Sequence, residues 1–265
     1  MDGTIIRVSK DVKLNKPILI AGLPGIGNVG KLAVDHIRKE LGATKFATLY
    51  SEHFPHQVIM LKSGGIRLVN NRFYYLKSKA KNGNDIVLLT GDAQAVTPEG
   101  QYEVNSKIVE FFKTKLGGTF IYTIGGYSIA QGIVKSPRVF ANVSRKEIMG
   151  QFKDLGIHFG ESKGIIWGSA GLIIAFAKMQ GMDGICLMGE TAFLELDANA
   201  AKAVIATLAK KLNLEIKTGN LDKLIKKTNH ALRGMEQQVG LGMPPAGGVP
   251  LEGGVDLSQK PSYIR

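Results

Sequence analysis

Residues 17–32 read PILIAGLPGIGNVGKL, and this stretch decides the fold class. Its first five residues form an apolar run typical of a buried strand. Glycines crowd the turn that follows, and helix-period residues then run from about Val29 to Leu41, where Gly42 ends them. A strand, a glycine-rich turn and a helix in immediate succession indicate a βα unit of a parallel sheet.

The same alternation continues along the chain. Three helices are predicted from their caps: Thr97 with Pro98 after it, Ser144 with Glu147 completing a capping box, and Asp197. Further apolar runs predict strands at 46–50, 85–90, 119–124, 139–143 and 184–188. We therefore predict an α/β fold with a doubly wound, mostly parallel sheet flanked by helices.

Two segments depart from this alternation. Residues 57–77 hold two or three short strands, with Gly64-Gly65 as a hairpin turn, and predict an antiparallel β insertion. From Gly240 to Arg265, ten of 26 residues are Gly or Pro, a composition that cannot pack a core. We expect a single α/β domain over residues 1–239 and a flexible tail over 240–265.

Composition limits the function classes. Apolar residues make up 44% of the 265 residues, enough for a sizeable core. The N-terminus has no apolar signal core, and the uncharged stretch at residues 164–177 is shorter than the roughly 20 residues of a spanning helix. The one cysteine, Cys186, lies in an apolar run and reads as a buried hydrophobe. We expect a cytoplasmic protein in a reducing compartment.

The formal net charge of +12 makes an acidic partner conceivable. Between Lys202 and Arg233 there are eight Lys or Arg residues against two acids. Few aromatic residues are interleaved with them, and basic helical faces are usually solvated. Nucleic-acid binding through residues 202–233 is therefore a lesser alternative.

The glycine-rich turn has three interpretations. Gly25, Gly27 and Gly30 match the spacing of a dinucleotide fingerprint, and Glu52 lies 22 residues later, where a ribose-binding acid would stand. The turn also resembles a P-loop, but Leu32 stands where that loop needs a hydroxyl for magnesium. The third interpretation is structural: glycines let the helix pack closely on the sheet and supply positive φ. We favour the third.

Polar and small residues follow two other predicted strands. Asp92 and Gln94 come after one, and Gly125 and Gly126 end another. Because ligands of open α/β sheets bind at the carboxyl ends of the strands, these residues could line a pocket with the glycine-rich turn. The alternative is that Asp92 satisfies backbone N–H groups of its own turn.

The sequence contains no convincing catalytic set. Residues 52–56, Glu-His-Phe-Pro-His, offer two histidines and one carboxylate, too few for zinc without further ligands, and read as a surface loop. Gly168-Ser169-Ala170-Gly171 is one residue short of a nucleophile elbow. We predict no catalytic residues, no metal and no cofactor.

The chain ends in Tyr263, Ile264 and Arg265, an aromatic and an aliphatic residue after a Gly/Pro-rich linker. Such an arm can dock in a groove of a partner, with its α-carboxylate pairing with a lysine. The alternative is a frayed terminus without a role.

Several blocks in series resemble the proteasome assembly chaperone family, in its archaeal type, over roughly residues 15–240. The blocks are Gly22–Gly30, Tyr50–Pro55, Ile86–Gln94, Thr123–Tyr127, Gly164–Gly168 with Gly171-Leu172, and Gly184–Thr191. The resemblance implies a fold similar to nucleoside phosphorylases, without established catalysis. It also implies homo-oligomers that assist proteasome assembly, or activate the core particle, without ATP.

Some archaeal members of the family that this chain resembles dock through a C-terminal motif of a hydrophobic residue, a penultimate Tyr and any last residue. This chain departs from the motif, because Tyr263 is third from the end and Ser262 precedes it. The resemblance still makes Tyr263, Ile264 and Arg265 the candidates for binding proteasome α-subunits. The alternative hypothesis is a nucleoside- or dinucleotide-binding enzyme that uses the glycine-rich turn.

Overall fold

The structure, a computed structural model, describes residues 3–80, 83–128, 134–160, 164–192 and 196–225. The part up to Asp222 forms one compact unit and is described by itself. The expected domain boundary at residue 240 and the tail lie outside the described residues.

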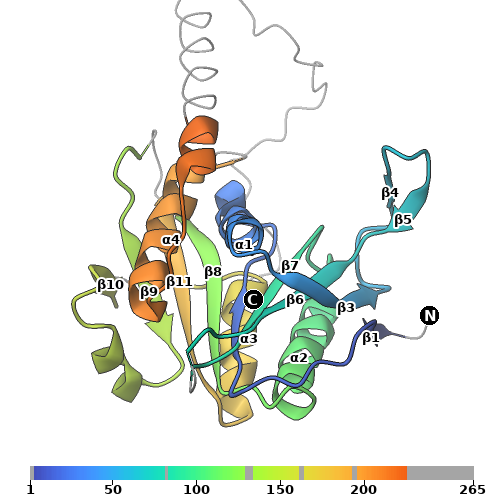
Figure 1. Cartoon of the computed structure of the whole chain (residues 1–265), viewed down its shortest axis with the longest axis horizontal. Helices are drawn as coiled ribbons and strands as arrows, with labels where there is room; N and C mark the ends of the chain where they lie inside the picture. The colour runs from blue at the N-terminus through green and yellow to red at the C-terminus, as the bar shows by residue number, and fades with distance from the viewer. Residues whose placement is uncertain (1–2, 81–82, 129–133, 161–163, 193–195, 226–265) are drawn as a thin grey trace, which may run out of the picture. The chain divides into compact units, whose positions relative to one another are not determined.

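The unit is built on a nine-stranded sheet (Figure 1). In spatial order its strands are β1 (Thr4–Val8), β3 (Thr44–Ser51), β6 (Asn71–Leu76), β7 (Ile86–Gly91), β2 (Ile18–Ala21), β8 (Phe120–Ser128), β11 (Asp183–Thr191), β9 (Val139–Val143) and β10 (Ile157–Phe159). The central strands β7, β2, β8 and β11 are parallel, as predicted.

The sheet is mixed toward its edges. The pairings β1–β3, β3–β6, β6–β7 and β11–β9 are antiparallel. A parallel pairing needs a long crossover, usually through a helix, whereas β6 reaches β7 through a short connection. The α/β class is confirmed, and "mostly parallel" holds for the centre of the sheet. Strands β1 and β10 were not predicted from the sequence.

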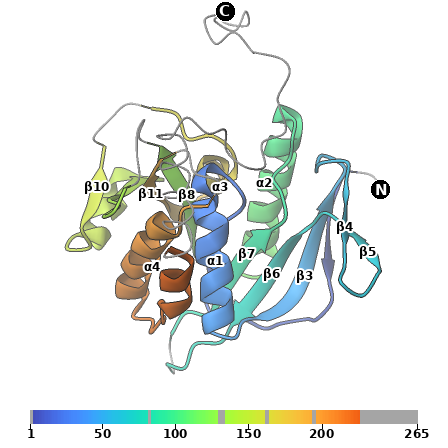
Figure 2. The same ribbon diagram turned by 90° about the horizontal axis from the view of Figure 1, so that it is seen from above.

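Two helices cover each face of the sheet (Figure 2). They are α1 (Val29–Glu40) with α4 (Ala198–Leu212), and α2 (Pro98–Thr114) with α3 (Ser169–Met179). Because both faces are covered, the central strands are apolar without alternation, and all six residues of β7 are buried. Among the described residues, no helix is long and apolar enough to cross a membrane.

Two of the three predicted helix caps are confirmed. Gly100 N donates to Thr97 Oγ1 over 3.1 Å at the start of α2, and Ala200 N donates to Asp197 Oδ1 over 2.9 Å at the start of α4. The cap at Ser144 is wrong: a 3-10 helix, η2 (Lys146–Phe152), forms there without a side-chain cap. Ser144 Oγ instead accepts from Gly184 N over 3.1 Å, because tertiary bonding to β11 prevails over local capping.

The predicted insertion forms a separate two-stranded antiparallel sheet, β4 (Val58–Met60) and β5 (Ile66–Leu68), which we term the β4–β5 arm (Figure 1). Gly64 supplies a φ of 83° in its turn. Val58 faces Leu68 and Met60 faces Ile66, so these four apolar side chains share one face. All four are exposed, Met60 by 85%.

Candidate functional site

A cavity of about 1030 Å³ opens at the edge where the central parallel strands end. The glycine-rich turn and the end of β8 form one side of it. The start of α2 and the segment leading into α3 form the other. Ligands of open α/β sheets bind at this edge, so the cavity is the candidate functional site.

The structure brings most of the predicted pocket residues to this cavity. Its lining includes Gly25, Gly30, Gln94, Gly125 and Gly126. Gly27 and Asp92 do not line it. Binding at any of these residues stays a prediction.

Gln94 joins three elements around the cavity. Its Nε2 donates to Pro24 O over 2.6 Å, and its Oε1 accepts from Ser169 N over 2.8 Å and from Gln101 Nε2 over 3.4 Å. The first residue before α3, Gly168, has no side chain to cap the helix, and Gln94 satisfies an N–H group of the first turn instead. Gln94 therefore fixes the glycine-rich turn, α2 and α3 to one another.

The glycines of the turn are required by close backbone contacts. A Cβ on Gly22 would lie 2.1 Å from Gly30 O, and a Cβ on Gly30 would lie 2.3 Å from Ile124 O. A Cβ on Gly126 would lie 2.5 Å from Ile26 O, in the 3-10 turn η1 (Ile26–Asn28) that precedes α1. The helix approaches the sheet as the structural interpretation of the glycines predicted.

Gly27 faces away from the cavity lining, toward β11 and α4. Its φ is 59°, and a Cβ there would lie 2.9 Å from Thr191 Oγ1 and 3.2 Å from Asp197 Cβ. Asp197 N also donates to Gly27 O over 2.8 Å. In a dinucleotide fold the second glycine lets the pyrophosphate approach the backbone, whereas here protein atoms fill that space.

Asp92 holds the β4–β5 arm instead of lining the cavity. Its carboxylate accepts from both terminal nitrogens of Arg67, at 2.5 and 3.0 Å, and from Arg72 at 2.8 Å. Asn70 N donates to it over 3.1 Å. Burial raises the pKa of Asp92, but these donors outweigh burial and leave the pKa below its ordinary value. The partners of Asp92 thus lie 20 to 25 residues away, on β5, on β6 and on the link between them, whereas the alternative interpretation had expected N–H groups of its own turn.

The described lining of the cavity contains no Asp, Glu, His, Lys or Arg. Its polar groups are amides and hydroxyls, such as those of Gln101 and Asn142. Its rim exposes apolar surface: Trp167 by 80%, Ile165 by 78% and Tyr102 by 61%. The cavity can therefore stack and hydrogen-bond an uncharged group. No local sequence pattern predicted that the segment before α3 would supply this exposed apolar surface.

The remaining candidate residues have local partners. His53 Nε2 lies 3.0 Å from Glu103 Oε2 and fixes its loop to α2. No group of three or more potential metal ligands occurs in the part of the chain that the structure describes. Cys186 is buried, as predicted, and burial raises the pKa of its thiol to about 11.

The basic residues of α4 also have partners. Lys202 pairs with Asp222 over 2.6 Å, Lys210 donates to Asp154 O, and Lys211 Nζ lies 4.6 Å from the ring centre of Phe152. The last part of the basic segment, residues 226–233, and the tail residues Tyr263, Ile264 and Arg265 lie outside the described residues.

Three comparisons place this architecture among known proteins. The sequence matches the PAC2 family over residues 19–237. It is 37% identical over 234 residues to the uncharacterized protein MJ1210 of Methanocaldococcus jannaschii, covering 88% of this chain and 86% of that protein.

Two solved structures from Pyrococcus furiosus share the fold. PbaB, described as an archaeal proteasome activator, is 39% identical with a TM-score of 0.84, covering 89% of this chain and all of PbaB. PbaA, described as an archaeal homolog of proteasome-assembly chaperone, is 25% identical with a TM-score of 0.72, covering 89% of this chain and 94% of PbaA.

Proposed function

The chain belongs to the PAC2 family, and from this premise we propose that it is an ATP-independent proteasome assembly chaperone or core-particle activator and not an enzyme. The observation that carries the proposal is the similarity of this chain to PbaB, which covers 89% of the chain. The filled space beside Gly27 and the leucine at position 32 both disfavour a nucleotide at the glycine-rich turn.

We place the protein in the cytoplasm as a homo-oligomer. The β4–β5 arm supports self-association, because a two-stranded sheet is marginally stable alone and its exposed apolar face gains by being covered. A second copy of the chain would cover it with the same uncharged face.

The proposed partner is a proteasome α-subunit, alone or in the core particle. The α/β domain, residues 1–239, would present the tail, residues 240–265, whose Tyr263, Ile264 and Arg265 dock in a groove with the α-carboxylate on a lysine. In an oligomer several tails act together, so weak single contacts sum to useful avidity.

The test is gel filtration of the protein mixed with proteasome core particles. Full-length chain is compared with a chain lacking residues 262–265 and with Tyr263→Ala, while Ser258→Ala serves as the matched control in the same tail. We expect co-elution of the full-length and control proteins and its loss in the other two. If the full-length protein co-elutes neither with core particles nor with free α-subunits, the proposed function is wrong.

The cavity supports one alternative, a nucleoside- or dinucleotide-binding enzyme of nucleoside phosphorylase type. Its aromatic rim and amide groups suit a neutral heterocycle. A ligand at 100 times its dissociation constant adds about 2.7 kcal/mol of stability, which thermal unfolding detects. Unchanged melting with nucleosides, NAD and phosphate would exclude this alternative.

A further inference from the structure

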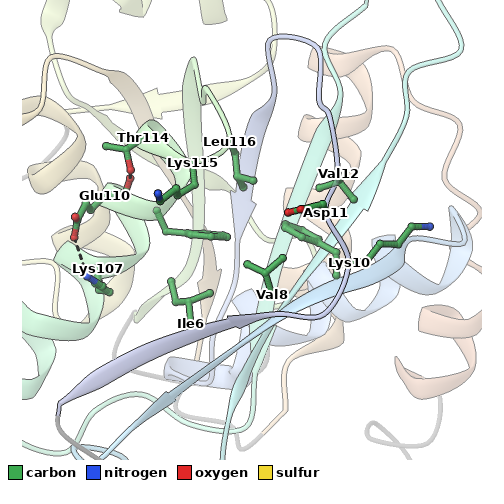
Figure 3. Close-up of a pocket in the computed structure, with 12 residues that line it drawn as sticks. Ile6, Val8, Lys10, Asp11, Val12, Lys107, Glu110, Thr114, Lys115 and Leu116 are labelled. Carbon is green, nitrogen blue, oxygen red and sulfur yellow. Dashed lines mark hydrogen bonds and ion pairs between the residues drawn. The ribbon is translucent and has the colours of Figure 1, made fainter.

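A second cavity, of about 340 Å³, lies between β1 and the carboxyl half of α2 (Figure 3). Its apolar lining includes Ile6 and Val8 on β1, Phe46 on β3, Phe111 on α2, and Leu116 just after α2. Figure 3 shows Ile6 and Val8 pointing from β1 into this space. The cavity therefore adjoins an edge strand.

β1 pairs only with β3 among the described residues and forms one edge of the sheet. Ser9 N donates to Phe46 O over 2.8 Å. This bond shows which residues of β1 direct their backbone groups toward β3. Hydrogen-bonded and non-hydrogen-bonded pairs alternate, so Ile5 and Arg7 bond to β3. The N–H and C=O groups of Thr4, Ile6 and Val8 then point outward, along the open edge.

Thr4 is already paired at this edge. The Glu103 carboxylate, on α2, accepts hydrogen bonds from Thr4, and these bonds hold the pKa of Glu103 below its ordinary value. The pairing agrees with the outward direction deduced from the register. Because Thr4 is paired, the outward backbone groups of Ile6 and Val8, beside the cavity, are the part of the edge considered for docking.

Charges surround the cavity with an excess of one positive group, Lys10, Lys107 and Lys115 against Asp11 and Glu110. Lys107 pairs with Glu110 over 3.2 Å, and Lys10 lies 5.8 Å from the ring centre of Tyr75. Lys115, at the end of α2, has no carboxylate partner within the described residues. This lysine and the net charge of +12 favour an acidic group on whatever binds here.

We propose that β1 and this cavity form a docking site for an extended segment of another protein. The segment adds a strand to β1 through the backbone of Ile6 and Val8, inserts an apolar side chain into the cavity and places an acidic residue at Lys115. The site goes beyond the proposed function, because it uses neither the tail nor the β4–β5 arm.

A second copy of the chain fits this site less well. If β1 of two copies paired edge to edge, Ile6 and Val8 of each copy would remain turned toward their own cavity. The space beside them would then stay unfilled. An extended segment with its own alternating side chains covers the edge and fills the cavity together.

The test uses a fluorescein-labelled peptide, Glu-Val-Glu-Leu-Glu-Val-Glu, and the full-length chain, with binding followed by fluorescence anisotropy. We expect saturable binding. Val8→Pro removes an outward N–H at an edge position where proline is tolerated, and should weaken binding about tenfold. Lys115→Glu should weaken it about threefold or more. The matched control Lys146→Glu, an exposed lysine of η2 near the other edge of the sheet, should leave it unchanged.

A second measurement guards against loss of structure in the Val8→Pro protein. A peptide with both valines replaced by proline cannot form the ladder, and it should fail to bind the unaltered protein. The proposal is overturned if the first peptide shows no saturable binding up to about 1 mM. It is also overturned if both variants bind as the unaltered protein does, or if Val8→Pro changes the sedimentation mass while the peptide does not bind, because a second copy then covers β1.

Discussion

The glycine-rich turn and the β4–β5 arm differ in packing: the turn is tightly packed, whereas the arm exposes apolar side chains. In the turn, backbone atoms approach so closely that a single methyl group has no room at Gly22 or Gly30. In the arm, the side chains of Met60 and Ile66 are exposed by 85% and 68%. The conspicuous glycine pattern of the turn is therefore explained by close packing of the backbone. The β4–β5 arm, which has no conspicuous motif, carries an exposed apolar surface that a partner can cover.

Gly30→Ala should have the largest effect of the changes that separate these regions. Its Cβ would meet Ile124 O at 2.3 Å, and a backbone atom of the central sheet cannot move aside as a side chain can. We expect the free energy of unfolding to fall by about 3 kcal/mol or more, measured by urea unfolding.

Gly42→Ala is the matched control for that change. Gly42 has a φ of 67° with nothing within 4 Å of the added Cβ, so only the left-handed backbone opposes alanine there. We expect a loss of about 1 kcal/mol. Equal losses at the two positions would show that backbone conformation, and not close packing, explains the glycines of the turn.

Asp92→Asn should have the next largest effect, because it removes the charge that holds the arm. Arg67 and Arg72 are exposed by only 29% and 24%, and both would lose their counter-ion. We expect a loss of about 2 kcal/mol in the free energy of unfolding and faster proteolysis within residues 61–65. Glu110→Gln, which breaks an exposed pair with Lys107, should cost less than about 0.5 kcal/mol.

The difference between the Asp92→Asn and unaltered proteins should depend on pH. The pKa of Asp92 is lower in the folded protein than its ordinary value of 3.8. Its stabilisation is therefore complete above about pH 5 and is lost as the pH falls below 3.8, through the folded pKa. Urea unfolding should give the same difference in the free energy of unfolding between the two proteins at pH 7 and pH 5. At pH 3 this difference should be smaller. A difference of the same size at pH 3 would contradict this role.

The sequence predicted the parts of the fold that depend on local patterns. Buried parallel strands are continuous apolar runs, as in β7, and the caps Thr97 and Asp197 act on N–H groups three residues away. Ser144 fitted the same capping pattern, but its hydroxyl bonds Gly184, 40 residues away. A partner that distant leaves no local signal, so this prediction failed.

The candidate site was predictable only where it follows strand ends. Gly125, Gly126 and Gln94 follow the carboxyl ends of predicted strands, and the fold brings those ends together. Trp167 and Tyr102 come from segments that meet only after α2 and α3 pack, and nothing in their local sequence indicates exposure. For Asp92 the sequence left two interpretations, a pocket residue or a partner of N–H groups in its own turn, because its pairing with Arg67 depends on the fold of the arm.

Met60→Lys should have the smallest effect on folding and still distinguish the arm from the turn. The side chain is already 85% exposed, so we expect the free energy of unfolding to change by less than about 0.5 kcal/mol. A buried self-contact would not accept the added charge, so sedimentation should show weaker self-association. Met179→Lys is the matched control, since Met179 is 80% exposed at the end of α3. If both variants associate equally well, the arm is not the contact between copies, and its apolar face must meet a different protein.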